Sequence, residues 1–316
     1  MNLAKQQQTI GASIGFNGVG VHSGEAVELT LHPADAGTGV VFQVTTPSGG
    51  IREIKAVSAN VSSTDLATVV GEPNGPGVAT IEHLMAALYA MEIDNVIVEI
   101  EGREVPIMDG CSHAFVQSIR EAGFVPQLAA RRYVRVLKPV RVEMGSAYGE
   151  YRPHDSTRFE IDIDFSSAAI GRQSFKADLT PDLFCEEISR ARTFGFMKDV
   201  ERLWASGHAL GSSLENSVVI GDDDGVINPG GLRYVDEFVR HKALDAIGDQ
   251  ALAGARILGC YRSYRGGHRL NAMALQALLS DPTAFEMVEV PVRTGTRARR
   301  ELSIGAASPA YEPQKL

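Results

Sequence analysis

Cysteine is scarce in this chain, with only Cys111, Cys185 and Cys260 among 316 residues. The three are odd in number, far apart and without Cys-x-x-Cys spacing, so the sequence indicates neither a disulfide framework nor a cysteine-rich zinc site. Isolated thiols of this kind are typical of a reduced, cytosolic protein. We therefore expect a cytoplasmic location.

Long apolar runs and an excess of positive charge are also missing. No apolar run approaches the roughly 18 residues that span a bilayer, and MNLAKQQQTIGAS at the start has no apolar segment of the signal-peptide type. The formal net charge of −9 disfavours nucleic acid as a partner, because such proteins usually present a basic face. The remaining composition, 44% hydrophobic and 22% charged, is that of an ordinary globular protein.

The apolar pattern predicts a similar order of elements twice. Residues 10–46 alternate as strands do, TIEHLMAALYAME predicts a helix with Thr80 as its N-cap, and DNVIVEIEG and AFVQSIREAGF follow as a strand and a helix. In the second half, strands precede residues 181–206, which are mostly helical in pattern; then come the helix VDEFVRHKALDAIGDQALAG, a strand, a short loop and a helix. We therefore expect an α+β fold of two similar domains, each a β-sheet layer packed on helices. The active site is expected in the cleft between them, where ligand sites are common.

The expected division into two domains follows from one segment that is typical of a linker, residues 127–132. It places the first domain at residues 1–127 and the second at 128–291. The tail, residues 292–316, carries RTGTRARR and then a stretch rich in proline, alanine and serine. We expect this tail to be poorly ordered.

His241 and Asp245 lie four residues apart on a predicted helix, so their side chains share one face, one turn apart. An imidazole and a carboxylate at this spacing can bind one metal ion together, as the two histidines of an H-E-x-x-H motif do. Lys242 and Asp249 fall on the same arc of the helix. The alternative is a solvated polar stripe with ion pairs between successive turns, and the pair supplies only half of a metal site.

Glu82 and His83 stand in a helix whose other residues are almost all apolar. Burying both without partners is costly, which favours a functional pair with His83 as ligand and Glu82 as base. The alternative is a glutamate favoured by the helix dipole and a hydrogen-bonded core histidine. His268 follows Gly266 and Gly267, which let the backbone approach a ligand closely. It suits a general acid or a phosphate contact, and the alternative is a surface histidine.

Eight segments spread over about residues 10–290 together resemble one family, the UDP-3-O-acyl-N-acetylglucosamine deacetylases. These are zinc amidases of lipid A biosynthesis in Gram-negative bacteria. The segments are GVGVHSG, TIEHLMAAL, IDNVIVEI, PIMDG, SRARTFGFM, LGSSLENSVV, EFVRHKALDAIGD and GGHRLN. Their joint order and spacing carry the resemblance, since no single short motif does.

The resemblance implies hydrolysis of the N-acetyl group of UDP-3-O-(3-hydroxyacyl)-N-acetylglucosamine to acetate and the free amine, the committed step of that pathway. It implies zinc ligands at His83, His241 and Asp245, with a fourth position left open as in catalytic zinc sites. Fe²⁺ could replace zinc, because affinity order alone does not set occupancy. The other histidines are not assigned to the metal, although His22 could line the cleft.

The same resemblance implies roles for four further residues in the chemistry. Glu82 would be the general base, and His268 the general acid, oriented by Asp249. Thr193 would donate a hydrogen bond to the oxyanion of the tetrahedral intermediate.

Substrate contacts are implied as well. Lys242 would help to hold the substrate, Arg265 stands where a basic residue near the phosphates is common, and Phe194 and Phe196 fall in the segment that shapes the acyl-chain passage. The chain departs from many members at Ala67, where a cysteine close to the metal is frequent. That cysteine is not among the catalytic residues, so the departure leaves the expected activity intact.

Two alternatives remain at this point. A non-catalytic protein that binds UDP-sugars or lipids would keep the groove and lose the chemistry, but Glu82, Thr193 and His268 occur here together with all three ligands. A zinc amidase for another acetylated sugar would share the ligand spacing, but RTFGF and GGHRLN favour the lipid A substrate. We expect a monomer without a transmembrane segment, which could approach a membrane transiently.

Overall fold

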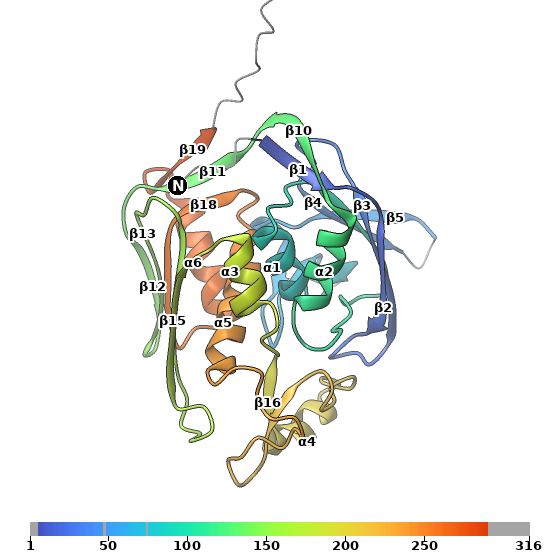
Figure 1. The fold of residues 1–316 in the computed structure, drawn as a ribbon, viewed down its shortest axis with the longest axis vertical. Coiled ribbons are helices and arrows are strands. Elements are labelled where there is room, and N and C mark those ends of the chain that lie inside the picture. Colours follow the sequence, from blue (N-terminus) through green and yellow to red (C-terminus); the bar gives the residue numbers. More distant parts are fainter. Residues whose placement is uncertain (1–5, 47–48, 74, 290–316) are drawn as a thin grey trace, which may run out of the picture.

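Two β-sheets form the outer layers of the molecule, and most of its helices lie between them (Figure 1). The computed structural model describes residues 6–46, 49–73 and 75–289. Among these residues, no helix combines the length and apolar character needed to cross a membrane. The tail for which the sequence predicts poor order, residues 292–316, lies outside the described ranges.

The first half consists of a five-stranded sheet and two helices. Its main elements are β2 (Ile14–Val19), β3 (Ala26–Pro33), β4 (Val40–Thr45), β5 (Ile51–Lys55), α1 (Glu82–Ala90), β9 (Val96–Glu101) and α2 (His113–Ala122). The strand order is β2-β3-β9-β4-β5. Central β9 pairs antiparallel with β3 and parallel with β4. The alternation of apolar residues in β3 buries one face of this sheet against the helices.

The second half repeats this arrangement. Its main elements are β11 (Arg132–Val136), β12 (Val140–Met144), β13 (Ala147–Arg152), β14 (Thr157–Asp164), β15 (Arg172–Asp178), α5 (Glu237–Ala251), β18 (Arg256–Tyr264), α6 (His268–Ser280) and β19 (Phe285–Glu289). Central β18 pairs antiparallel with β13 and parallel with β14, while β12 and β15 flank them. β11 and β19 extend the sheet beside the first part of β18. The expected fold of two similar α+β domains is confirmed.

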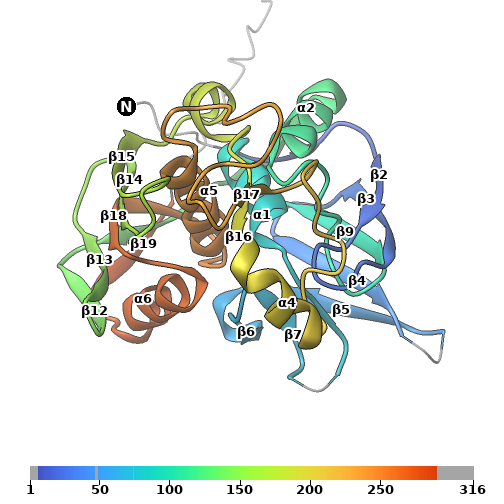
Figure 2. The ribbon, with the colours of Figure 1, turned by 90° about the horizontal axis from the view of Figure 1, so that it is seen from below.

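The remaining elements connect the halves or cover their ends. They are β1 (Gln6–Ile10), the 3₁₀ turn η1 (Ser58–Asn60), β6 (Val61–Ser63), β7 (Val69–Gly71), β8 (Gly77–Val78), β10 (Phe124–Ala130), α3 (Pro181–Leu183), the π-helical turn η2 (Phe184–Ile188), β16 (Phe194–Phe196), α4 (Met197–Ala205) and β17 (Val218–Ile220). β16, β17 and α4 project from the helical layer at one end of the molecule (Figures 1 and 2).

The structure corrects one local prediction and refines two others. Residues 127–132, expected to form a linker, lie mostly in β10, which pairs with β1 in a two-stranded surface sheet, where residues such as Leu128 stay exposed and hide the strand pattern. Thr80 does not cap α1; its backbone has a φ of 56° and its hydroxyl donates to Glu104. Residues 181–206, expected to be mostly helical, contain α3, η2 and α4, and β16 lies between η2 and α4 and pairs with β17.

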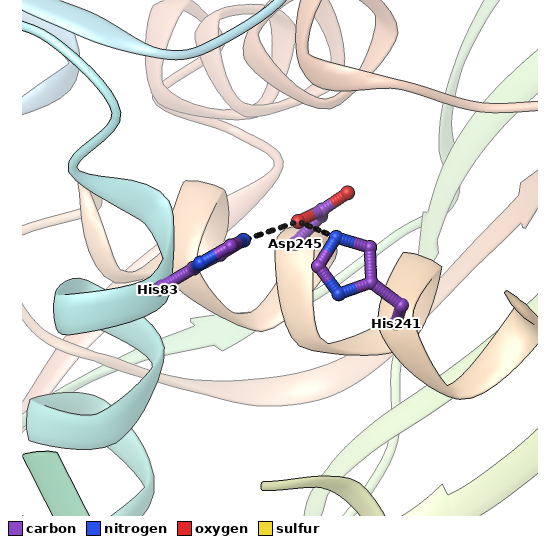
Figure 3. A group of neighbouring side chains, drawn as sticks. All are labelled: His83, His241 and Asp245. Atoms are coloured by element: carbon purple, nitrogen blue, oxygen red, sulfur yellow. Dashed lines mark ion pairs between the residues drawn. The ribbon is translucent and has the colours of Figure 1, made fainter. Parts of the chain in front are cut away.

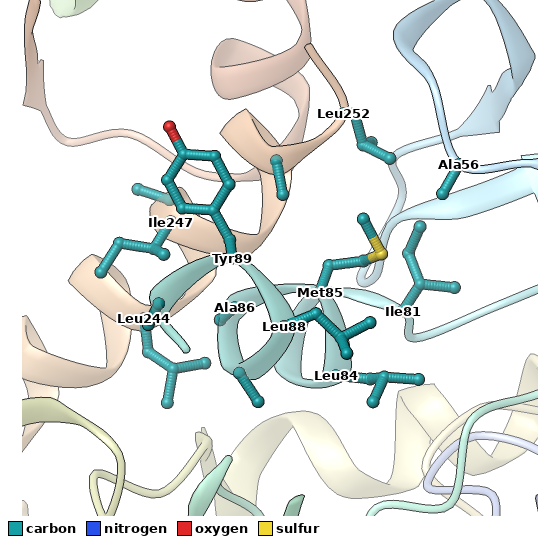
Figure 4. Packing of buried hydrophobic residues seen from close by; sticks show 14 of the residues in the cluster. Ala56, Ile81, Leu84, Met85, Ala86, Leu88, Tyr89, Leu244, Ile247 and Leu252 are labelled. Carbon is teal, nitrogen blue, oxygen red and sulfur yellow. The ribbon is translucent and has the colours of Figure 1, made fainter. Parts of the chain in front are cut away.

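The two central helices, α1 and α5, pack directly against each other (Figure 4). Every residue of α1 is buried, and in α5 only Arg240 and Lys242 are not. Apolar side chains such as Leu244 fill this interface, and each fully buried aliphatic side chain contributes about 1.5–3 kcal/mol. The absence of a side chain at Gly248 permits the close approach, since a Cβ there would collide with the carbonyl oxygen of Glu82.

Candidate active site

The close approach of α1 and α5 brings His83, His241 and Asp245 together (Figure 3). Asp245 Oδ1 lies 3.3 Å from His241 Nε2 and 3.6 Å from His83 Nε2. The two imidazole rings are 5.0 Å apart and nearly perpendicular, and one ligand atom from each residue lies within 4.8 Å of the others. All three side chains are buried. The i,i+4 pair predicted on α5 therefore has its third partner on α1.

The polar atoms of this group fit a metal cation. Asp245 Oδ1 is buried without a hydrogen-bond donor from the described residues, while Oδ2 accepts from Lys242 Nζ at 2.8 Å. His241 Nδ1 lies 3.1 Å from the carbonyl oxygen of Ala191, which favours a proton on Nδ1 and a free lone pair on Nε2. Two imidazole nitrogens and one carboxylate oxygen form a donor set typical of catalytic zinc.

The electrostatics around His241 and Asp245 favour the protonation states that metal binding requires. Burial lowers the pKa of His241 to about 3, so its imidazole is neutral at physiological pH. Burial raises the pKa of Asp245, but His241 and Lys242 outweigh it and hold that pKa well below its usual value. A neutral imidazole and an ionised carboxylate are ready to coordinate a cation.

Glu82 lies beside this group at the start of α1. Its Oε1 is 3.7 Å from His268 Nε2, and its Oε2 accepts the backbone N–H of Thr68 at 3.0 Å. Burial raises the pKa of Glu82. A carboxylate with a raised pKa is a better proton acceptor, as a general base requires.

His268 begins α6 and faces Glu82 across the site. Its Nδ1 lies 3.0 Å from Asp249 Oδ2, which also accepts from Asn271 Nδ2 at 2.8 Å. Burial lowers the pKa of His268, but the charges of Asp249 and Glu82 outweigh it and raise that pKa to about 10. The imidazole is therefore protonated at neutral pH, with Nε2–H directed toward the centre of the group.

A cavity of ≈ 580 Å³ is lined by Glu82, His83, His241, Asp245 and His268, whereas Asp249 lies behind His268 and is not part of the lining. Of the other predicted contacts, Thr193, Phe194, Phe196 and Lys242 also line it, and the Phe194 ring lies 6.2 Å from that of His241. Arg265 is not among the lining residues. Its guanidinium forms an ion pair with Asp164 at 3.0 Å on the surface of the second sheet.

Much of the apolar wall of this cavity was not predicted. It comes from α4 and the loop after it, chiefly Met197, Val200, Leu203, Trp204 and Leu214. The spacing of the first four along α4 is that of one helix face, which is the pattern that could have revealed it. His22, considered as a possible cleft residue, is part of the lining.

Comparison with known proteins agrees with this geometry. The chain matches the model of the family described as UDP-3-O-acyl N-acetylglycosamine deacetylase over residues 7–280, a stretch that contains every site residue described above. Proteins named UDP-3-O-acyl-N-acetylglucosamine deacetylase from Brucella ovis, Brucella canis and Brucella melitensis are each 55% identical to it over 286 residues. The aligned part covers 90% of this chain and 98% of each relative. The chain therefore belongs to the UDP-3-O-acyl-N-acetylglycosamine deacetylase family.

Proposed function

We propose that this protein is a zinc-dependent deacetylase. Its substrate is UDP-3-O-(3-hydroxyacyl)-N-acetylglucosamine, and its products are acetate and the free amine, in the committed step of lipid A biosynthesis. The names of the relatives support the substrate class. The main support for a bound metal comes from Asp245 Oδ1. This buried carboxylate oxygen faces two imidazoles and accepts no hydrogen bond from the described residues. Burying an oxygen without a partner is costly, and a metal ion coordinated by Oδ1 would offset that cost.

The metal would be held by His83, His241 and Asp245. A zinc ion there would polarise the acetamido carbonyl and lower the pKa of water from about 15.7 toward 7. Fe²⁺ suits the same donors, and metal availability would decide between the two ions.

The chain's own residues then carry the proton transfers. Glu82 accepts the proton of the attacking water, and His268 donates the Nε2 proton to the leaving nitrogen. Positioned acids and bases contribute typically 10²–10⁴-fold each. The hydroxyl of Thr193 donates to the oxyanion, an interaction whose loss costs roughly 10²–10³ in rate. Asp249 holds the His268 ring by its Nδ1, so Nε2 stays directed at the substrate.

Substrate binding uses the two ends of the cavity differently. The apolar wall with Phe194 and Phe196 receives the acyl chain, whose burial yields about 0.8 kcal/mol per CH₂. Lys242 contacts the polar part of the substrate. We assign Arg265 to the diphosphate outside the cavity, where its exposed guanidinium would exchange Asp164 for phosphate oxygens.

The remaining expectations are part of the same proposal. The protein acts in the cytoplasm as a monomer, and approaches a membrane only transiently. Residues 1–127 and 128–291 form its two domains.

A deacetylase assay tests this function directly. Acetate release is measured from UDP-3-O-acyl-N-acetylglucosamine and from UDP-N-acetylglucosamine, with and without a chelator. We expect turnover of the acylated substrate at a much higher kcat/KM, lost with chelator and restored by zinc. Equal kcat/KM on both substrates would refute the acyl passage, and turnover in metal-free protein would refute the metal. Binding without turnover would identify a binding protein instead.

A further inference from the structure

We propose that Thr68 is a positioning residue that fixes the general base and the partner of the general acid at the same time. The residue immediately precedes β7 in the first half of the molecule and is 1% exposed. This inference rests on the proposed function, because it assumes that Glu82 and His268 act as base and acid.

Thr68 contacts both carboxylates that flank His268. Its backbone N–H donates to Glu82 Oε2 at 3.0 Å, and its hydroxyl donates to Asp249 Oδ1 at 2.6 Å. Glu82 belongs to α1 and Asp249 to α5, so a single residue links the two helices at the site. The carbonyl oxygen of Thr68 also accepts the N–H of Ile81, the residue before α1, at 3.4 Å.

The four residues form a closed ring of contacts. Glu82 directs Oε1 toward His268 Nε2 and Oε2 toward Thr68. Asp249 directs Oδ2 toward His268 Nδ1 and Oδ1 toward Thr68. Each carboxylate thus has one oxygen next to His268 and the other bonded to Thr68. Because a carboxylate rotates about its last bond, fixing one oxygen also fixes the other.

The hydroxyl is the essential part of the contact with Asp249. Among the described residues, Asp249 Oδ1 accepts only from Thr68, whereas Oδ2 is shared by His268 and Asn271. Without the hydroxyl, Oδ1 is a buried acceptor with no donor, and the carboxylate gains by turning toward other donors. That turn would move the His268 ring away from the leaving nitrogen, although no metal ligand is touched.

Three variants test the proposal in the zinc-loaded protein. Thr68→Val removes the hydroxyl at nearly constant shape, Thr68→Ser keeps it, and Thr157→Val is the matched control. Thr157 is also buried, and its hydroxyl donates to the carbonyl oxygen of Ile257 at 2.7 Å, but it does not line the cavity. We expect Thr68→Val to lower kcat on the order of 10- to 100-fold, with little change in KM and in bound zinc. Thr68→Ser should restore most of kcat, and Thr157→Val should keep it.

A second readout does not depend on turnover. The His268 Nδ1 proton, held by Asp249, should give a downfield proton NMR resonance that Thr68→Val shifts or broadens and Thr68→Ser preserves. Should Thr68→Val fail to fold, Thr68→Ala carries the same test with a smaller side chain.

The proposal is overturned by a folded Thr68→Val protein with wild-type kcat and an unchanged resonance. It is also overturned by equal losses in Thr68→Val and Thr68→Ser, which would indicate packing in place of hydrogen bonding. A wild-type protein that releases no acetate, but whose resonance responds to Thr68→Val and not to Thr68→Ser, would refute the proposed function and leave the positioning role standing.

Discussion

The two halves of this molecule share a strand order, yet they contribute differently to the site. α1 supplies Glu82 and His83 from its first turn, whereas α5 supplies residues from three successive turns, His241, Asp245 and Asp249. Neither helix holds the whole candidate metal site, since one of its three residues comes from α1. The two similar halves therefore position these side chains, and we propose that the reaction takes place in the cleft between them.

The helices that follow the central strands, α2 and α6, also differ between the two halves. α2 follows β9 and begins at His113, as α6 follows β18 and begins at His268. Burial, aided by Arg190, lowers the pKa of His113, while Asp249 and Glu82 raise that of His268 to about 10 despite its burial. The position at the start of a helix thus does not decide the pKa of a histidine; the neighbouring charged groups do.

Removing a metal ligand from either half should have the largest effect. His83→Ala on α1 and Asp245→Ala on α5 should each lower deacetylation by several orders of magnitude and reduce bound zinc, because each leaves two ligands of three. Elemental analysis and acetate release measure both quantities. A variant of one half that kept its zinc and activity would show that the site does not need both halves.

Replacing the histidines at the starts of α2 and α6, His113 and His268, should affect kcat very differently. His268→Gln should lower kcat by about 10²–10⁴-fold, and Glu82→Gln by a similar factor. His113→Gln, which changes the corresponding residue of the first half, should leave kcat near wild type, since His113 contacts Ser189 and lies outside the cavity lining. Similar losses of kcat in both histidine variants would contradict the proposed difference between His113 and His268.

The pH profile of kcat/KM should show which carboxylate raises the pKa of His268. His268 must be protonated, so kcat/KM should hold through neutral pH and fall as pH rises through its raised pKa. Asp249→Asn removes the leading cause of the raised pKa, so the alkaline limb should move to lower pH. An alkaline limb that stays in place in this variant would assign the limb to another group.

The smallest effect is expected for a substitution at the contact between α1 and α5. Gly248→Ala places a methyl group against the Glu82 carbonyl, so it should lower the free energy of unfolding by about 1–3 kcal/mol in urea denaturation. Gly15→Ala, on β2 with open space around its Cβ position, is the control and should change stability little. Equal stability of the two variants would mean that the helices can separate at little cost.

The sequence predicts those parts of the site that lie close together along the chain. The i,i+4 spacing of His241 and Asp245 and the polar pair in an apolar helix at Glu82 and His83 both indicate chemistry, and the structure places all four around one point. The two-domain α+β fold also follows from the order of apolar patterns. These are local properties, which periodicity can reveal.

Contacts between distant segments could not be predicted in this way. Thr68 and Asp249 are separated by 181 positions, and TDLATVV has the ordinary pattern of a strand. The strand β10 could not be predicted because it pairs with β1 at the surface, where burial does not impose a pattern. The wall from α4 has amphipathic spacing, but its partner is a ligand cavity that the sequence alone does not outline.

We propose that the two halves jointly hold one metal ion that the reaction requires. Zinc titration into metal-stripped protein, with acetate release measured at each point, tests it most directly. We expect activity that rises with bound zinc and levels off at one ion per chain. Deacetylation by the metal-free protein, or a plateau unrelated to one ion per chain, would contradict it.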